Sequence, residues 1–103
     1  MGVLEGKAEN FDEIVKDSTV LVDFNADWCG PCQILKPVIE EFAEEAREVK
    51  VVSVNIDDEE ELAEKFGVEG IPCLVVLKNG EEVTRSVGVI PKKKIEKLLE
   101  KAK

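Results

Sequence analysis

The chain has 103 residues, of which 44% are hydrophobic and 36% charged, and its formal net charge is −9. This length predicts one domain, residues 1–103, with a core of its own. The negative charge argues against nucleic acid and anionic membrane surfaces as partners. No basic stretch leads into an apolar run near the start, and the longest apolar run is far below the ~18 residues of a membrane span. We therefore expect a soluble, monomeric protein of the cytoplasm.

Strand patterns and helix patterns alternate along the chain. Apolar residues at helical spacing predict helices, β-branched and apolar runs predict strands, and Asn79-Gly80 is a strong hairpin signal. In chain order we expect a helix at 11–15, a strand at 19–26, a helix at about 31–47, a strand at 49–56, a helix at 58–67 capped by Asp58, a hairpin over 73–88 and a helix at about 95–102. A short strand before residue 11 is barely signalled. This order predicts an α/β fold, in which a mixed sheet carries helices on both faces.

Cys29-Gly30-Pro31-Cys32 stands between the strand at 19–26 and the helix that follows it. Pro31 suits the first helical turn, and Gly30 lets the backbone turn sharply. Residues three apart share a helix face, so the two sulfurs can form a disulfide. The free N–H groups and positive end of the helix favour a thiolate at Cys29. We expect Cys29 to attack a disulfide, and Cys32, deeper and less exposed, to resolve the product.

Other interpretations of the pair remain open at this point. A metal knuckle would need about four ligands, but the chain has only Cys73 as a further cysteine and no His. A structural disulfide would close too short a loop to stabilise much, and two inert thiols are a third possibility. A CxxC motif at the start of a helix, directly after a buried strand, favours redox chemistry.

The sequence resembles the thioredoxin family through nearly its whole length. The motifs VLVDF, WCGPC, a Pro at position 37, NID, FGVEGIP, KNG and VG occur in the family's order and spacing. The resemblance implies the thioredoxin fold, with a central mixed five-stranded sheet flanked by four helices. It also implies that Cys29 forms a mixed disulfide with a client protein and that Cys32 releases the reduced client. A thioredoxin reductase would then restore the dithiol, with no metal or cofactor other than the Cys29–Cys32 disulfide.

The resemblance assigns further site residues outside the pair. Pro72 matches the family's cis-proline, which lies against the active site and helps to hold the client backbone. The positions that match the client-binding surface are Trp28, Gly70, Ile71, Gly88 and Val89.

Asp23 is a single charge inside the apolar run VLVDF. Burial in a central strand would raise its pKa and make it a candidate proton acceptor for Cys32, directly or through a water. The alternative is an Asp on a solvated strand face. In the resemblance, Asp23 matches the family's buried acid.

Three positions depart from the family's pattern. An aromatic residue is usual at Asn25, a Lys at Ser53 and a Thr at Cys73. Without a nearby Lys, we expect Asp23 to be harder to ionise. Cys73 is either a small buried hydrophobe or an accessory thiol beside the reactive pair.

A protein-disulfide reductase is therefore the leading functional hypothesis. One alternative is a binding subunit of the same fold with incidental redox activity. The other is a metal-binding protein that uses Cys29, Cys32 and Cys73.

Overall fold

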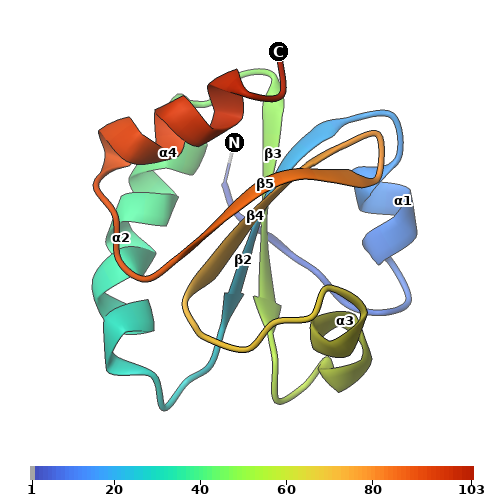
Figure 1. Cartoon of the computed structure of the whole chain (residues 1–103), viewed down its shortest axis with the longest axis vertical. Coiled ribbons are helices and arrows are strands. Elements are labelled where there is room, and N and C mark those ends of the chain that lie inside the picture. Colours follow the sequence, from blue (N-terminus) through green and yellow to red (C-terminus); the bar gives the residue numbers. More distant parts are fainter. Residues whose placement is uncertain (1) are drawn as a thin grey trace.

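The computed structural model describes residues 2–103, which form five strands and four helices (Figure 1). The elements in chain order are β1 (Leu4–Glu5), α1 (Phe11–Val15), β2 (Thr19–Asn25), α2 (Gly30–Glu45), β3 (Val49–Asn55), α3 (Glu60–Lys65), β4 (Cys73–Lys78), β5 (Glu81–Val87) and α4 (Lys92–Glu100). Each predicted element is present, and most boundaries lie within a few residues of the expected ones.

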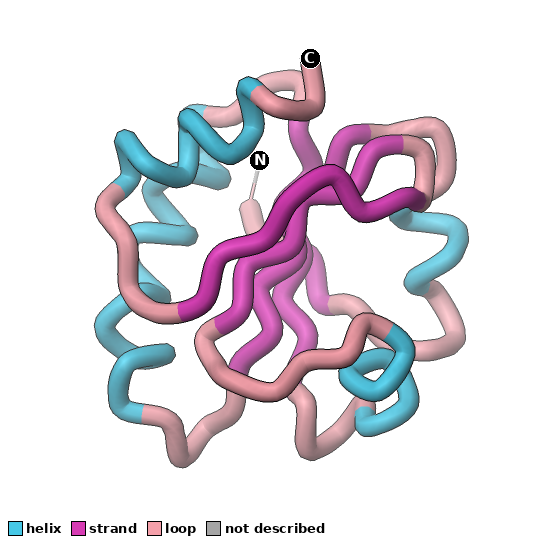
Figure 2. The backbone as a smooth tube through the Cα atoms, in the orientation of Figure 1, coloured by secondary structure: helices cyan, strands magenta, loops and turns pink. Residues whose placement is uncertain are grey.

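The strands form one mixed sheet in the order β1-β3-β2-β4-β5 (Figure 2). β1, β3 and β2 run parallel, β4 is antiparallel to β2, and β5 is antiparallel to β4. The β4–β5 hairpin turns at Asn79 and Gly80, whose φ angles are +54° and +84°. Two positive φ angles in succession are typical of the tight hairpin turn that Asn-Gly favours. The mixed five-stranded sheet with four helices is thus confirmed.

The helices cover the sheet in two layers. α1 and α3 pack on one face, and α2 and α4 pack on the other (Figure 1). Side chains alternate along β2, so Val22 and Phe24 point to the α1/α3 face while Leu21 points to the α2/α4 face. Both faces of this central strand are buried, which explains why its apolar run is continuous.

The start of α3 differs from the expectation. The helix begins at Glu60, and its N-cap residue, Glu59, makes no capping hydrogen bond with its side chain. Asn55 Oδ1 instead accepts hydrogen bonds from the main-chain N–H groups of Asp57 and Asp58, at 2.9 and 3.2 Å. The predicted Asp58 cap is therefore wrong, because the polar side chain that closes this turn comes from the end of β3.

In residues 2–103, no helix has the length and apolar character needed to span a membrane.

Candidate active site

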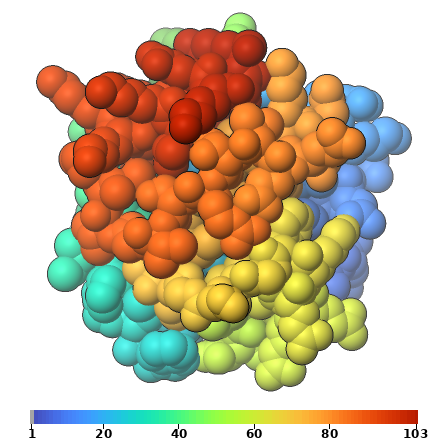
Figure 3. Space-filling view, viewed as in Figure 1, coloured from blue at the N-terminus to red at the C-terminus, as the bar shows by residue number. Residues whose placement is uncertain are grey.

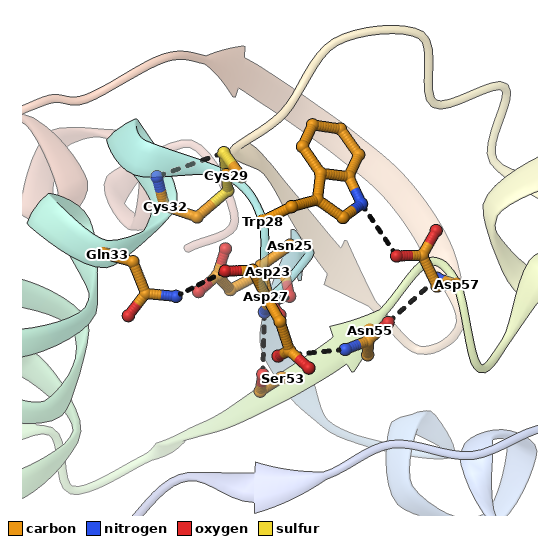
Figure 4. Close-up of a disulfide and its surroundings, with 10 residues drawn as sticks. All are labelled: Asp23, Asn25, Asp27, Trp28, Cys29, Cys32, Gln33, Ser53, Asn55 and Asp57. Carbon is orange, nitrogen blue, oxygen red and sulfur yellow. Dashed lines mark hydrogen bonds between the residues drawn. A yellow bond between two sulfur atoms is a disulfide. The ribbon is translucent and has the colours of Figure 1, made fainter.

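The reactive cysteines lie where the central strand gives way to the longest helix. β2 ends at Asn25, and Cys29 is the N-cap residue of α2. Cys29 and Cys32 form a disulfide, with their Cα atoms 5.2 Å apart (Figure 4). The main-chain N–H of Cys32 donates a hydrogen bond of 3.2 Å to Cys29 Sγ. A sulfur at this place faces an N–H group and the positive end of the helix dipole, both of which stabilise negative charge.

The expected difference in exposure between the two thiols is absent. Cys29 is 4% exposed and Cys32 is 5% exposed, so in the disulfide form both are buried. Ala26 packs with both, and Ile71 covers them from the segment ahead of β4. The two cysteines therefore differ in their position in the helix and in the N–H···Sγ hydrogen bond that Cys29 accepts, and not in burial.

The sequence also suggested that Gly30 is needed for a sharp turn of the backbone, and this expectation is wrong. Gly30 is the first residue of α2, and its φ is not among the positive values of the described chain. A Cβ at this position would meet nothing within 4 Å. The turn into the helix therefore does not require glycine, whereas Pro31 occupies the early helical position that the sequence predicted.

Asp23 lies on the face of β2 that α2 covers. Asp23 is 6% exposed, and it is the one charged residue that is buried in the part of the chain described. Oδ1 has no hydrogen-bond partner. Burial raises the pKa of Asp23 from 3.8 to about 6, and the neighbouring Asn25 side chain opposes the rise. The buried interpretation, and the direction of its pKa shift, are therefore confirmed.

Asn25 and Ser53 form a polar bridge beside this carboxyl. The Asn25 amide donates to Ser53 Oγ at 2.8 Å and to the main-chain oxygen of Asp23 at 2.9 Å. In the parallel register of β2 and β3, Asp23 and Ser53 are paired. Two of the positions that depart from the family's pattern thus contact one another, and sequence reasoning treated them separately.

Trp28 is held by a residue that sequence reasoning missed. Trp28 is 70% exposed, and its Nε1 donates a hydrogen bond of 2.8 Å to Asp57 Oδ2 (Figure 4). Asp57 follows β3, and Asn55 Oδ1 accepts from its main-chain N–H. The NID motif marked this loop in the sequence, but a contact between residues 28 and 57 depends on how β2 and β3 pair.

Of the remaining predicted surface residues, Ile71 packs against the cluster that holds the disulfide. The Ile71–Pro72 peptide bond is cis, as the resemblance implied. The main-chain N–H of Gly88 donates to the Pro72 oxygen at 2.8 Å, and Val89 is exposed. In the space-filling view, the cyan start of α2 meets the gold segment ahead of β4 at the lower edge of the molecule (Figure 3). Gly70 lies in that same segment, where a Cβ would approach Val87.

Cys73 is a buried free thiol at the start of β4. It is 1% exposed and packs in the core cluster on the α1/α3 face, opposite Phe24 in register. Its neighbour Leu74 packs on the α2/α4 face, as alternation requires. Burial is the largest cause that raises the pKa of the Cys73 thiol, and the Arg85 guanidinium opposes it. These features favour the small-hydrophobe interpretation.

The described residues do not support the metal-binding alternative. Cys73 belongs to a different core cluster from Cys29 and Cys32. Within residues 2–103, no group of three or more His, Cys, Asp or Glu side chains could hold a metal ion. The three cysteines therefore do not supply a shared set of ligands.

Comparisons with known proteins agree with this geometry. The Thioredoxin family model matches residues 2–101. A thioredoxin of Bacillus subtilis is 40% identical over 102 residues, 98% of each chain, and one of Chlamydia caviae is 45% identical over 89% of this chain and 90% of its own. A mutant thioredoxin from Halobacterium salinarum NRC-1 superposes with a TM-score of 0.90 at 38% identity, covering 96% of this chain and 88% of that one. With a cysteine pair at the start of α2, the chain belongs to the thioredoxin family and is a thiol–disulfide oxidoreductase that reduces protein disulfides.

Proposed function

We propose that Cys29 is the attacking thiol of this reductase and Cys32 the resolving thiol. The observation that carries the assignment is the hydrogen bond from the Cys32 N–H to Cys29 Sγ at the start of α2. The thiolate is the nucleophile in disulfide exchange, and this sulfur is the one whose negative charge the helix end stabilises. Cys32 lies one turn inside the helix, within reach of the bond that Cys29 would form.

The reaction then proceeds in two exchanges. The Cys29 thiolate attacks a client disulfide, forming a mixed disulfide with one client sulfur and expelling the other as a thiolate. Cys32 loses its proton and attacks Cys29 Sγ. The client sulfur leaves as a thiolate that takes a proton from solvent, and the Cys29–Cys32 disulfide remains. The client gains two electrons and the dithiol loses two.

Asp23 is the proposed acceptor of the Cys32 proton. It lies on the sheet face covered by α2, the helix that carries Cys32. A carboxyl whose pKa is about 6 is ionised in most molecules near neutral pH, yet it is a stronger base than an ordinary Asp. The free Oδ1 supports this role because it leaves an acceptor position open.

The client would dock around Trp28. We propose Trp28, Ile71 and Val89 as apolar contacts, and Pro72 and Gly88 as the backbone positions that hold an extended client segment. The supporting observations are that Ile71 packs against the disulfide cluster, that the Gly88 N–H donates to the Pro72 oxygen, and that Trp28 and Val89 are exposed. Gly70 lies in the loop of Ile71 and would allow close approach.

We propose that a thioredoxin reductase restores the dithiol and that disulfide-containing proteins are the clients. The chain would work as a monomer in the cytoplasm, as one domain spanning residues 1–103, with no cofactor beyond its own disulfide. The support is the family membership together with a site built from this chain's own residues.

The test is reduction of a synthetic peptide containing one disulfide, supplied with a panel of NADPH-linked and ferredoxin-linked reductases. Wild type is compared with Cys29→Ser and with Cys73→Ser, which removes a thiol outside the pair. We expect turnover with wild type and Cys73→Ser and none with Cys29→Ser. Turnover that survives in Cys29→Ser would overturn the assignment of the nucleophile, whereas no turnover of wild type with any reductase would favour the alternative of a binding subunit with incidental redox activity.

A further inference from the structure

A cavity of about 580 Å³ opens beside the buried carboxyl. It lies between α2 and the neighbouring ends of β1, β2 and β3, and Asp23, Asn25 and Ser53 form part of its lining. This volume is far larger than one water molecule requires, and its lining offers several hydrogen-bonding groups. Asp23 is therefore buried against protein yet borders a space that water can enter.

The Asn25–Ser53 bridge fixes the wall of this cavity next to Asp23. The Asn25 amide nitrogen donates to Ser53 Oγ and to the Asp23 main-chain oxygen, which holds the side chain beside the Asp23 carboxyl, where it opposes the rise in pKa that burial causes. In the described chain, Asp23 Oδ1 is the buried side-chain oxygen that no protein group satisfies. A buried acceptor left free beside a polar cavity is a binding position for water.

Other charged groups face the same cavity. Those on its lining are the lysines Lys7 and Lys36 and the acids Glu5, Asp27, Glu40, Asp58 and Glu59. From the opposite sheet face, the Cys73 thiol is close enough for the charge of Asp23 to raise its pKa. Burial is nevertheless the largest cause of the Asp23 pKa shift, and Asn25 is the group that opposes it.

We propose that Asn25 and Ser53 are positioning residues that keep the Asp23 carboxyl open to the cavity, so that the proton taken from Cys32 leaves through the cavity to solvent. The proposal rests on the role of Asp23 proposed above. In this proposal both residues act through Asp23.

Every proton in the resolving step can be accounted for. Cys32 gives its proton to the Asp23 carboxylate, and its thiolate forms the bond to Cys29 Sγ while the bond to the client sulfur breaks. The protonated Asp23 then passes its proton to water in the cavity and returns to the carboxylate. One proton has moved from Cys32 to solvent, and one proton from solvent has joined the client thiolate.

The experiment measures resolution and first attack separately against pH. Resolution is followed by acid quench and mass spectrometry of the mixed disulfide with the peptide client, and first attack is measured in the Cys32→Ser background. The key variant is Asn25→Leu, whose side chain has the same number and branching of heavy atoms but no amide. Gln33→Met is the matched control, because Gln33 also lines the cavity but donates to the main-chain oxygen of Asp27. Asn25→Gln restores an amide.

For Asn25→Leu we expect the pH midpoint of resolution, and the Asp23 titration seen by carboxyl NMR, to rise together by about one unit. Resolution then slows about tenfold near pH 5 and little near pH 8, since one unit changes the ionised fraction tenfold only below the midpoint. First attack is unchanged, Gln33→Met matches wild type, and Asn25→Gln recovers part of the shift. Should Asn25→Leu fold poorly, Ser53→Ala is expected to shift the midpoint in the same direction by less.

Two outcomes would contradict the proposal, and they are distinguishable. If Asp23→Asn resolves mixed disulfides at the wild-type rate, the role of Asp23 fails and the positioning role fails with it. If Asp23→Asn slows resolution but Asn25→Leu and Ser53→Ala both keep the wild-type midpoint, only the inference about the bridge is overturned.

Discussion

Trp28 and Asp57 join two loops across the reactive end of the molecule. The indole Nε1 of Trp28 donates to Asp57 Oδ2 at 2.8 Å, although the ring itself is largely exposed. The bond orients a large apolar surface next to Cys29 without burying it. An oriented aromatic side chain loses less conformational freedom when a partner docks on it.

Asp57→Ala is expected to raise the KM for the peptide client about threefold to tenfold, because one hydrogen bond contributes about 0.5–1.5 kcal/mol. The rate of first attack at saturating client should change little, since Cys29 keeps its N–H donor. Asp58→Ala is the control, because it removes the same charge from the next position without a contact to Trp28. Equal effects of the two substitutions would show that charge, and not the indole contact, is responsible.

Asp23→Asn is expected to stabilise the protein at neutral pH. The folded-state pKa of Asp23 is raised from 3.8 to about 6, so the folded state binds the proton more tightly and stability falls as pH rises through that interval. The difference of about two pKa units corresponds to roughly 3 kcal/mol as an upper bound.

Urea unfolding at several pH values checks this expectation. The variant should exceed wild type in free energy of unfolding near pH 7, and the gap should close as the pH falls below about 3, where the wild-type carboxyl is protonated in both states. Glu9→Gln, at an exposed position, should show no such gap. A gap of the opposite sign near pH 7 would refute the burial argument.

Cys73 is expected to resist modification in the folded protein. It is almost fully buried, and burial raises its pKa, so little reactive thiolate is accessible. After reduction, a brief treatment with iodoacetamide near pH 8 followed by mass spectrometry should find label on Cys29 and none on Cys73. Labelling of Cys73 should appear only in denaturant, and rapid labelling of the folded protein would restore the accessory-thiol interpretation.

Gly6→Ala is expected to be destabilising by about 1–3 kcal/mol, the usual effect of overpacking. A Cβ on Gly6 would lie 2.6 Å from Val52 Cγ1 and 2.9 Å from Val54 Cγ2, in the core between β1 and α1. Gly30→Ala is the matched comparison, since a Cβ there meets nothing. Thermal unfolding should separate the two variants, and equal melting temperatures would contradict the packing argument.

The sequence predicted those features that depend on neighbouring residues. Three local patterns each predicted the right element: the apolar run of β2, the Asn79-Gly80 turn of the hairpin and the helical spacing after Cys32. The same patterns placed the cysteine pair at the start of α2, because the motif stands between a strand pattern and a helix pattern in the sequence.

Features that depend on how distant segments pack could not be predicted in the same way. The Asn25–Ser53 hydrogen bond requires the register of β2 against β3, and the burial of Cys29 requires Ile71 to lie over it. Alternation shows that Cys73 and Leu74 face opposite sides of β4. The pairing of β2 with β4 is needed to show that Asp23 shares the α2/α4 face of the sheet with Leu74 and not the α1/α3 face with Cys73.

Trapping of the mixed disulfide tests whether Cys29 is the thiol that attacks the client. Cys32→Ser is mixed with the oxidised peptide client, and the adduct is located by mass spectrometry after digestion. We expect a stable adduct of one client sulfur on Cys29, and no adduct when Cys29→Ser is treated in the same way. An adduct that forms on Cys32 in the Cys29→Ser variant, at a rate similar to that on Cys29, would contradict the division of roles between the two thiols.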